Sequence, residues 1–210
     1  MRLSESRGLI IFFFLIAAIL LWCVSSKAQT PPNSPVKISP ASDKKASFPI
    51  FELPIPKNDA QKNYLGISGS GKFMTTQIKS PVIIIEVFSK DCRHCQKAAP
   101  LVNELYMAIK ARPDMKEKIK IIGIGANNSN MEVEFFRANY QVPFPLFPDH
   151  DGAISQKIGI TGTPTLIGVK NNDDGTMEKF YFKTEMFWFW DANRFLKKII
   201  KLSELEQGGQ

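Results

Sequence analysis

The chain has 210 residues, 44% of them hydrophobic, which suffices for one domain with appended segments but not for two full domains. Its three cysteines exclude a disulfide-rich scaffold, because Cys23 lies in an apolar N-terminal segment and only Cys92 and Cys95 remain. The formal charge of +7 does not indicate a nucleic-acid partner, because the basic residues are spread along the chain without a stripe of interleaved aromatic side chains.

Residues 1–28 have the pattern of an export segment. Two arginines precede an apolar run at residues 9–24, and small residues mark a plausible cleavage site after Ala28. The segment is either a signal peptide that is removed or an anchor that stays in the inner membrane. A lipid on Cys23 is disfavoured by the bulky residue before it. We therefore expect the rest of the chain in the periplasm or another extracytoplasmic compartment, where disulfide chemistry is possible.

Residues 29–62 contain seven prolines among polar residues, a composition that resists helix and central strand and indicates a tether. Apolar residues at 48–53 could dock on the edge of the domain that follows. That domain is predicted at residues 63–203, with a polar tail at 204–210.

The hydrophobic pattern then predicts alternating strands and helices. An apolar, β-branched run at residues 82–88 predicts a buried central strand, and a second run at 119–126 predicts another. The other predicted elements are an edge hairpin of residues 64–66 with 72–78, helices at 96–110, 131–140 and 186–202, a short helix ending at 158, and a terminal hairpin of 165–170 with 176–182. In the last helix, Trp188 is expected in the core, with Phe187 and Trp190 on the surface.

Cys92 and Cys95 stand between the strand at 82–88 and the helix after it. The unpaired N–H groups and the positive dipole end of a helix N-terminus favour an anion, so the Cys92 thiol should ionise easily. Cys95, one helical turn later, is near enough to form a disulfide with it. This context predicts a reactive redox pair.

Other uses of the two cysteines fit less well. A structural zinc site needs about four ligands, and the chain adds only two histidines, so we expect no metal. Haem attachment requires a histidine after the second cysteine, where Gln96 stands, and no other cofactor is expected. A static disulfide remains an alternative, although so short a loop would stabilise the fold only weakly.

A second motif, Gly162-Thr163-Pro164, follows the cysteines by about 70 residues. With it, the order of elements over residues 64–202 resembles the α/β thioredoxin-like fold, in particular the exported redoxins of the TlpA/ResA type. In that family the proline is cis and lies against the disulfide. The segment 144–152 resembles the redoxin insertion. The resemblance implies a central mixed β-sheet flanked by helices, with an N-terminal hairpin.

The resemblance also implies roles for individual residues. Cys92 would attack a substrate disulfide, Cys95 would resolve the mixed disulfide, and Thr163 and Pro164 would hold the incoming chain. The partners would be protein dithiols or disulfides and a membrane electron donor or acceptor.

Glu86 stands six residues before Cys92, where thioredoxins have a buried acid. Burial would raise its pKa and suit it to accept the proton of Cys95; the alternative is a polar residue facing the sheet edge. Arg93 and His94 could stabilise the thiolate and contact the substrate, whereas Asp91 should oppose ionisation. His94 could equally be a solvated spacer. The direction of electron flow is left open.

Two other functions are consistent with the sequence. Peroxiredoxins have the pattern Pro-x-x-x-Thr/Ser-x-x-Cys; here Ser89 matches that pattern, but Ile85 replaces the proline. A thiol-dependent peroxidase is therefore one alternative. The other is a non-catalytic module that binds extended peptides at Thr163 and Pro164.

Overall fold

The structure, a computed structural model, describes residues 46–184 and 191–205. The predicted export segment, residues 29–45 of the predicted tether, and the aromatic residues Phe187, Trp188 and Trp190 lie outside the described residues. Among those that are described, we find no helix both long and apolar enough to cross a bilayer.

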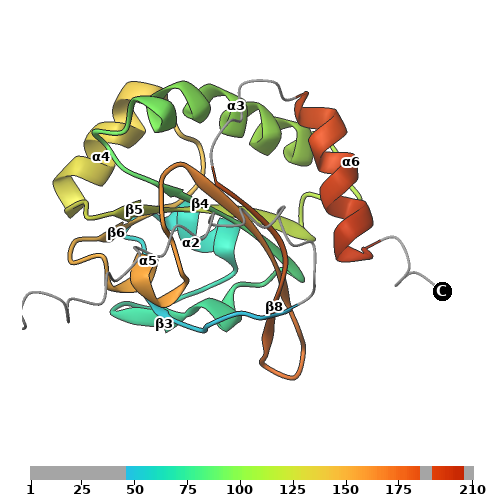
Figure 1. Cartoon of the computed structure of the whole chain (residues 1–210). Helices are drawn as coiled ribbons and strands as arrows, with labels where there is room; N and C mark the ends of the chain where they lie inside the picture. The colour runs from blue at the N-terminus through green and yellow to red at the C-terminus, as the bar shows by residue number, and fades with distance from the viewer. Residues whose placement is uncertain (1–45, 185–190, 206–210) are drawn as a thin grey trace, which may run out of the picture. The chain divides into compact units, whose positions relative to one another are not determined.

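A six-stranded mixed sheet with the strand order β1-β8-β7-β4-β5-β6 forms the centre of the domain (Figure 1). Its middle strand, β4 (Val82–Phe88), pairs in parallel with β5 (Ile119–Ala126) and antiparallel with β7 (Thr165–Asn171). Every residue of β4 and β5 is buried, which explains why both strands consist mainly of apolar residues. The outer strands are β8 (Met177–Thr184), β6 (Leu146–Asp149) and the two-residue β1 (Ala46–Ser47).

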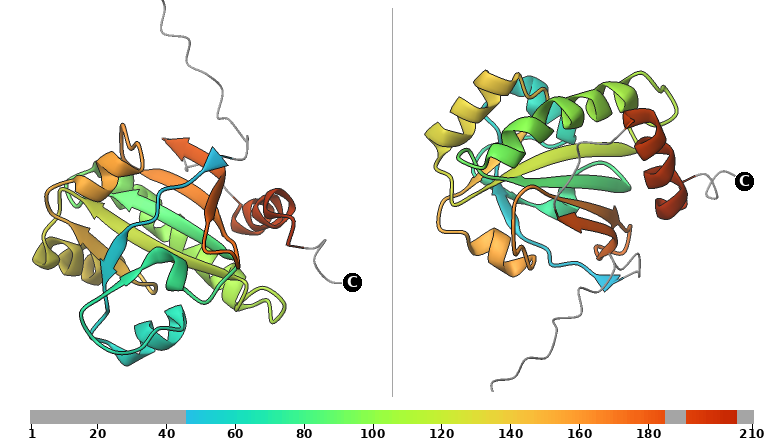
Figure 2. Two further views of the ribbon diagram at one scale, coloured as in Figure 1. Left: turned by 90° about the horizontal axis from the view of Figure 1, so that it is seen from below. Right: turned by 45° about the horizontal axis from the view of Figure 1, so that its top comes forward.

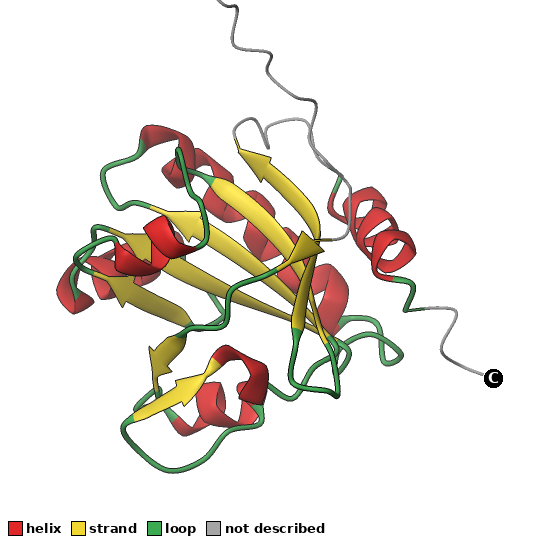
Figure 3. Ribbon diagram, turned by 60° about the horizontal axis from the view of Figure 1, so that its bottom comes forward, coloured by secondary structure: helices red, strands yellow, loops and turns green. Residues whose placement is uncertain are grey.

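Helices cover one face of this sheet and a mixed layer covers the other. The first face carries α3 (Arg93–Lys110), α4 (Asn130–Tyr140) and α6 (Ala192–Ser203), as Figures 1 and 2 show. The second carries α5 (Ala153–Lys157) and a small unit that lies in front in Figure 3. This unit consists of β2 (Glu52–Pro54), α2 (Asp59–Leu65), β3 (Lys72–Met74) and a 3-10 turn (Thr75–Gln77). Alternate residues of β4 pack into the two layers, Ile84 and Phe88 towards α3, Ile83 and Ile85 towards the other layer. The predicted thioredoxin-like fold is thereby confirmed.

The helices on the first face begin and end for local reasons. Ser129 caps α4, and its hydroxyl accepts the N–H of Glu132 while the Glu132 carboxylate accepts the N–H of Ser129. The helix predicted at 131–140 is confirmed within one residue. In α6 the apolar face packs on the sheet through Phe195 and Ile199, as predicted, and the described helix begins at Ala192.

The N-terminal edge differs from the prediction. Residues 64–66, expected as a strand, are instead the end of α2, which begins after Asn58, whose side chain accepts the N–H of Gln61. Gly66 ends the helix in the left-handed conformation, which favours glycine. The partner of β3 is β2, with Leu53 opposite Phe73. The predicted hairpin was wrong because its first strand would need residues that the capped helix α2 contains.

Residues 48–53 dock on the second face of the sheet, as the sequence suggested. Phe48, Phe51 and Leu53 are buried there against strand residues such as Ile83 and Ile85. Packed structure therefore begins before the predicted boundary at residue 63.

The segment compared with the redoxin insertion forms β6 and α5, between α4 and β7. The sequence did not predict β6 as a strand, because prolines lie in and around it. Pro148 is tolerated because β6 pairs only with β5 and forms one edge of the sheet. On β5 this pairing begins at Gly123. Earlier in the same strand, the N–H of Ile121 donates instead to the hydroxyl oxygen of Tyr64 at 2.6 Å.

Leu53 provides a test of the docked segment. We expect Leu53→Ala to lower the free energy of unfolding by about 2–5 kcal/mol, because the side chain is fully buried. Urea titration measures this, and the neighbouring exposed Glu52→Ala should change the same quantity by less than about 0.5 kcal/mol. Equal small effects of the two substitutions would contradict the docked arrangement.

Candidate active site

Cys92 occupies the turn between β4 and α3 and is the N-cap of that helix. Its Sγ accepts the backbone N–H of Cys95 at an N···S distance of 3.2 Å. The N–H of Cys92 donates to the carbonyl of Ser89 at 3.1 Å, which closes the turn. The side chain is half-buried, so the sulfur sits at the start of the helix while remaining accessible. This is the placement that the sequence predicted.

The surroundings of Cys92 stabilise its thiolate. Partial burial raises the pKa, but hydrogen bonds from the Cys95 thiol and the Thr163 side chain and from the N–H groups of Cys95 and His94 lower it by more. The net pKa of Cys92 is therefore below that of an ordinary cysteine. A half-exposed cysteine with a lowered pKa is a nucleophile.

Cys95 has the opposite properties. Its side chain is fully buried on the inner face of α3, and this burial, together with its hydrogen bond to Cys92, strongly raises the pKa of the Cys95 thiol. Both cysteines are free thiols in the structure. The Cys92 thiol therefore ionises more easily than an ordinary cysteine, and the Cys95 thiol less easily.

The loop before β7 lies against Cys92. The Thr163–Pro164 peptide bond is cis, as the resemblance implied, and the Thr163 carbonyl accepts the Cys92 thiol at an S···O distance of 3.3 Å. Because a carbonyl only accepts, this contact favours the protonated form of Cys92, whereas the hydrogen bond from the Thr163 side chain lowers the pKa of Cys92. The loop is fixed by Thr165, whose hydroxyl donates to the Gly162 carbonyl at 2.7 Å. Because Thr165 also pairs with Val87 of β4, the loop is brought to the end of the strand that precedes Cys92.

Glu86 is fully buried within β4, so it does not face the sheet edge. It shares its strand face with Ile84 and Phe88, and this face packs under α3 together with Cys95. Neither carboxyl oxygen has a hydrogen-bond partner, and burial raises the pKa of Glu86 to about 8. The buried acid with a raised pKa that the sequence predicted is therefore present in the structure.

The charged residues beside Cys92 are exposed. Arg93 and His94, between the two cysteines, both face the solvent. Asp91, which we expected to oppose ionisation of Cys92, is paired with the Lys90 ammonium at 2.5 Å. Lys90 thus offsets part of the negative charge next to the nucleophile.

Two side chains at this site were missed by the sequence analysis. Asn128 accepts the backbone N–H of Lys90, and Gln96 donates to the backbone carbonyl of the same residue. A signal for Asn128 existed, because it lies two residues after the end of β5, and the carboxyl ends of the parallel strands β4 and β5 meet at the same edge of the sheet. Gln96 has no such signal.

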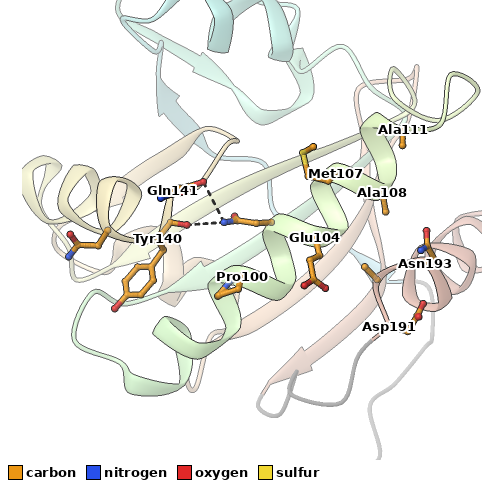
Figure 4. Close-up of a pocket in the computed structure, with 12 residues that line it drawn as sticks. Pro100, Glu104, Met107, Ala108, Ala111, Tyr140, Gln141, Asp191 and Asn193 are labelled. Carbon is orange, nitrogen blue, oxygen red and sulfur yellow. Dashed lines mark hydrogen bonds between the residues drawn. The ribbon is translucent and has the colours of Figure 1, made fainter.

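One pocket in the described region has neither cysteine in its lining. It is a groove of about 930 Å³ between α3, the end of α4 and the start of α6, lined by Pro100, Met107, Tyr140 and Ala192 among others (Figure 4). None of the predicted site residues lines it. Within residues 46–184 and 191–205, no cluster of three or more metal-binding side chains was found.

Glu86→Gln should change how stability depends on pH. The carboxyl has a pKa of about 8 when folded and 4.5 as its reference value, so between these pH values the unfolded chain binds fewer protons and the wild type loses stability as pH rises. Glutamine does not titrate. The stability of the reduced variant relative to wild type should therefore increase by about 1.4 kcal/mol per pH unit over this window.

Urea unfolding of both proteins between pH 4 and 9 measures this difference. Glu104→Gln, at an exposed position of α3, is the matched control and should show a difference that stays flat with pH. A flat difference for Glu86→Gln would mean that the carboxyl is not protonated in the folded protein.

Cys92 should react with iodoacetamide at pH 7 several-fold faster than the same cysteine in the urea-unfolded chain, because more of it is thiolate. Cys95 should stay unmodified in the folded protein, since it is buried and its pKa is raised. Peptide mass mapping separates the two sites and Cys23. Equal rates in the folded and unfolded chains would show that the fold does not activate Cys92.

Comparisons with known proteins agree with this geometry. Residues 81–174 match a family model described as thioredoxin-like. The thiol-disulfide oxidoreductase ResA of Bacillus thuringiensis subsp. konkukian is 30% identical over 95 residues, which are 45% of this chain and 51% of that protein. ResA of Geobacillus thermodenitrificans is 22% identical over 110 residues, 50% of this chain and 60% of that protein. The chain thus spans about half the length of the curated relatives it matches.

Solved structures support the same fold. The thioredoxin domain of a thiol-disulfide oxidoreductase from Bacteroides vulgatus has a TM-score of 0.53 at 13% identity, covering 74% of this chain and 96% of that one. StoA from Bacillus subtilis has a TM-score of 0.51 at 18% identity, covering 72% and 96%. Likeness at this identity supports the fold alone. Together with the match of residues 81–174 and the paired cysteines, it supports a thioredoxin-like fold for this chain, which is similar to ResA-type thiol-disulfide oxidoreductases over about half of its length.

Proposed function

We propose that the protein is a thiol-disulfide oxidoreductase that exchanges disulfides with protein substrates through Cys92 and Cys95. The observation that carries this proposal is the contrast between the two thiols. Cys92 is accessible and its pKa is lowered at the start of α3, whereas Cys95 is buried and its pKa is raised. An attacking thiolate with a protonated partner behind it is the arrangement that stepwise exchange requires.

In the first step the Cys92 thiolate attacks one sulfur of a substrate disulfide. A bond forms between Cys92 and that sulfur, the substrate S–S bond breaks, and the other substrate sulfur leaves as a thiolate that takes a proton from water. This step reduces one of the two substrate sulfurs, while the other is held with Cys92 in a mixed disulfide. The same steps in reverse oxidise a substrate dithiol.

In the second step Cys95 attacks the Cys92 sulfur of the mixed disulfide and releases the substrate as a dithiol. The Cys95 proton must leave first, because the thiolate is the nucleophile. Glu86 suits this task, since it lies on the same side of the sheet and its pKa is about 8. About a tenth of the Glu86 carboxyls are ionised at pH 7 and able to accept the proton.

Substrate contact is assigned to the residues around the Cys92 sulfur. The Thr163 backbone, 3.3 Å from that sulfur, is placed to pair with an extended substrate chain, while the buried Pro164 fixes the loop. The exposed side chains of Arg93 and His94 flank the nucleophile and would meet the residues next to the substrate cysteine.

We also propose that this exchange takes place outside the cytoplasmic membrane. The support is the export pattern of residues 1–28, which would be cleaved or would anchor the protein to the inner membrane. Disulfides persist in such compartments. A membrane electron donor or acceptor would then restore the starting state of the cysteine pair.

Cys95→Ser should trap the first step. In a Cys23→Ser background, which removes the third thiol, incubation with a disulfide-containing protein should give a covalent complex that dithiothreitol releases. Cys92→Ser, the matched control, should give none. Non-reducing gel electrophoresis with mass mapping of the linked peptides measures both.

Other outcomes distinguish the alternatives. Consumption of peroxide with a thiol donor, without a trapped protein, would indicate a peroxidase. Binding of extended peptides that is unaffected by either substitution, without any covalent complex, would indicate a binding module.

A further inference from the structure

Two side chains that the exchange steps do not use hold the turn that carries Cys92. Asn128, in the loop after β5, accepts the backbone N–H of Lys90 through Oδ1 at 2.8 Å. Gln96, in the first turn of α3, donates from Nε2 to the carbonyl of Lys90 at 2.9 Å. Both backbone polar groups of a residue two positions before the nucleophile are thus fixed by side chains from two different elements.

Lys90 in turn determines where Cys92 lies. It is inside the turn that the bond from Cys92 N–H to the Ser89 carbonyl closes, and the Cys92 carbonyl accepts the N–H of Gln96 at 3.1 Å. A displacement of Lys90 therefore moves Cys92 relative to the first turn of α3. Hydrogen bonds weaken steeply when they are misaligned, so the contact from Cys95 N–H to the Cys92 sulfur would suffer.

Asn128 occupies a place built for it. The residue is only 2% exposed, and its Nδ2 donates to the carbonyl of Asn127 at 3.2 Å. A side chain at residue 125 would crowd Asn128, because a Cβ on Gly125 would lie 3.1 Å from the Asn128 Cβ and 2.8 Å from the Val133 side chain. A buried polar group that bonds across 38 residues of sequence links the β5–α4 loop to the active-site turn.

The same loop also reaches the Lys90 side chain. Ser129 caps α4 together with Glu132, and a Glu132 carboxylate oxygen lies 3.8 Å from the Lys90 ammonium. Lys90 is therefore held by its backbone and, more weakly, by its side chain.

We propose that Asn128 and Gln96 are positioning residues for disulfide exchange: by fixing the backbone of Lys90 they keep the Cys92 sulfur on the N–H groups at the start of α3. They act through Lys90 rather than on the sulfur itself. The inference rests on the proposed function, because it concerns the reactivity of the same nucleophile.

The test is the pH dependence of iodoacetamide alkylation at Cys92 in the full chain, carrying Asn128→Ala or Gln96→Ala. Each substitution removes the hydrogen bond to one backbone polar group of Lys90. We therefore expect at least about a threefold smaller thiolate fraction of Cys92 at neutral pH, seen as a Cys92 pKa raised by about half a unit. The disulfide should also become less oxidising towards glutathione, since the thiolate of the reduced form is less stable. The double variant should shift the pKa by less than the sum of the single shifts, because both residues act through Lys90.

Asn103→Ala is the matched control. Asn103 is also an amide on α3 that donates to backbone carbonyls, those of Tyr140 at 2.8 Å and Gln141 at 3.4 Å, and these bonds lie along the groove in Figure 4, away from Cys92. Its substitution should lower the melting temperature without moving the pKa of Cys92. If the buried Asn128 cannot be replaced without unfolding the chain, Gln96→Ala still tests the same pair of bonds, because Gln96 is only half-buried.

The outcomes separate the two proposals. An unchanged Cys92 pKa in Gln96→Ala, with a loss of stability like that of Asn103→Ala, would reduce both residues to a structural role and overturn the inference. Failure of the Cys95→Ser variant to form a mixed disulfide would overturn the proposed function instead, whatever the Asn128 and Gln96 variants do to the pKa of Cys92.

Discussion

The hydrogen bond from the backbone N–H of Cys95 to the sulfur of Cys92 is the interaction on which the site depends. A helix N-terminus has unpaired N–H groups that must find an acceptor, and here a cysteine sulfur takes the position that serine or aspartate usually fills. Capping the helix and activating the nucleophile are therefore one interaction. Any change that moves the sulfur off this position weakens both.

The rest of the domain is arranged to keep this cap in place. The fully buried strand β4 fixes where the turn begins, and α3 is held on the sheet by apolar contacts along its length. The antiparallel neighbour β7 brings Thr163 to the sulfur, while the parallel neighbour β5 brings Asn128 to the turn. Beneath them, the unpartnered Glu86 costs stability once it ionises, and such a cost is commonly found where a protein tunes a reaction.

Local patterns explain which parts of this arrangement could be predicted. The strands at 82–88 and 119–126 are apolar except for Glu86 and Lys120, the cap at Ser129 lies within four residues of its partner, and the cysteine spacing itself implies a shared helix face. In contrast, β2 is three residues long with a proline, and its burial depends on a sheet face formed by distant segments. The bonds of Asn128 and Gln96 could not be predicted either, although the position of Asn128 near the end of β5 could, because an amide carries no mark of the backbone group to which it will bond.

Tyr64 has a consequence for the behaviour of the protein in solution. Ile121 precedes the first residue of β5 that pairs with β6. Without a partner, its N–H would be an open donor on a sheet edge, and such edges can pair with strands of other molecules. The Tyr64 hydroxyl accepts that N–H, and the Tyr64 ring packs against Tyr106 and lies under the Lys120 ammonium. The Tyr64 hydroxyl therefore leaves no open donor at Ile121 with which another strand could pair, and it comes from a helix that the sequence pattern did not reveal.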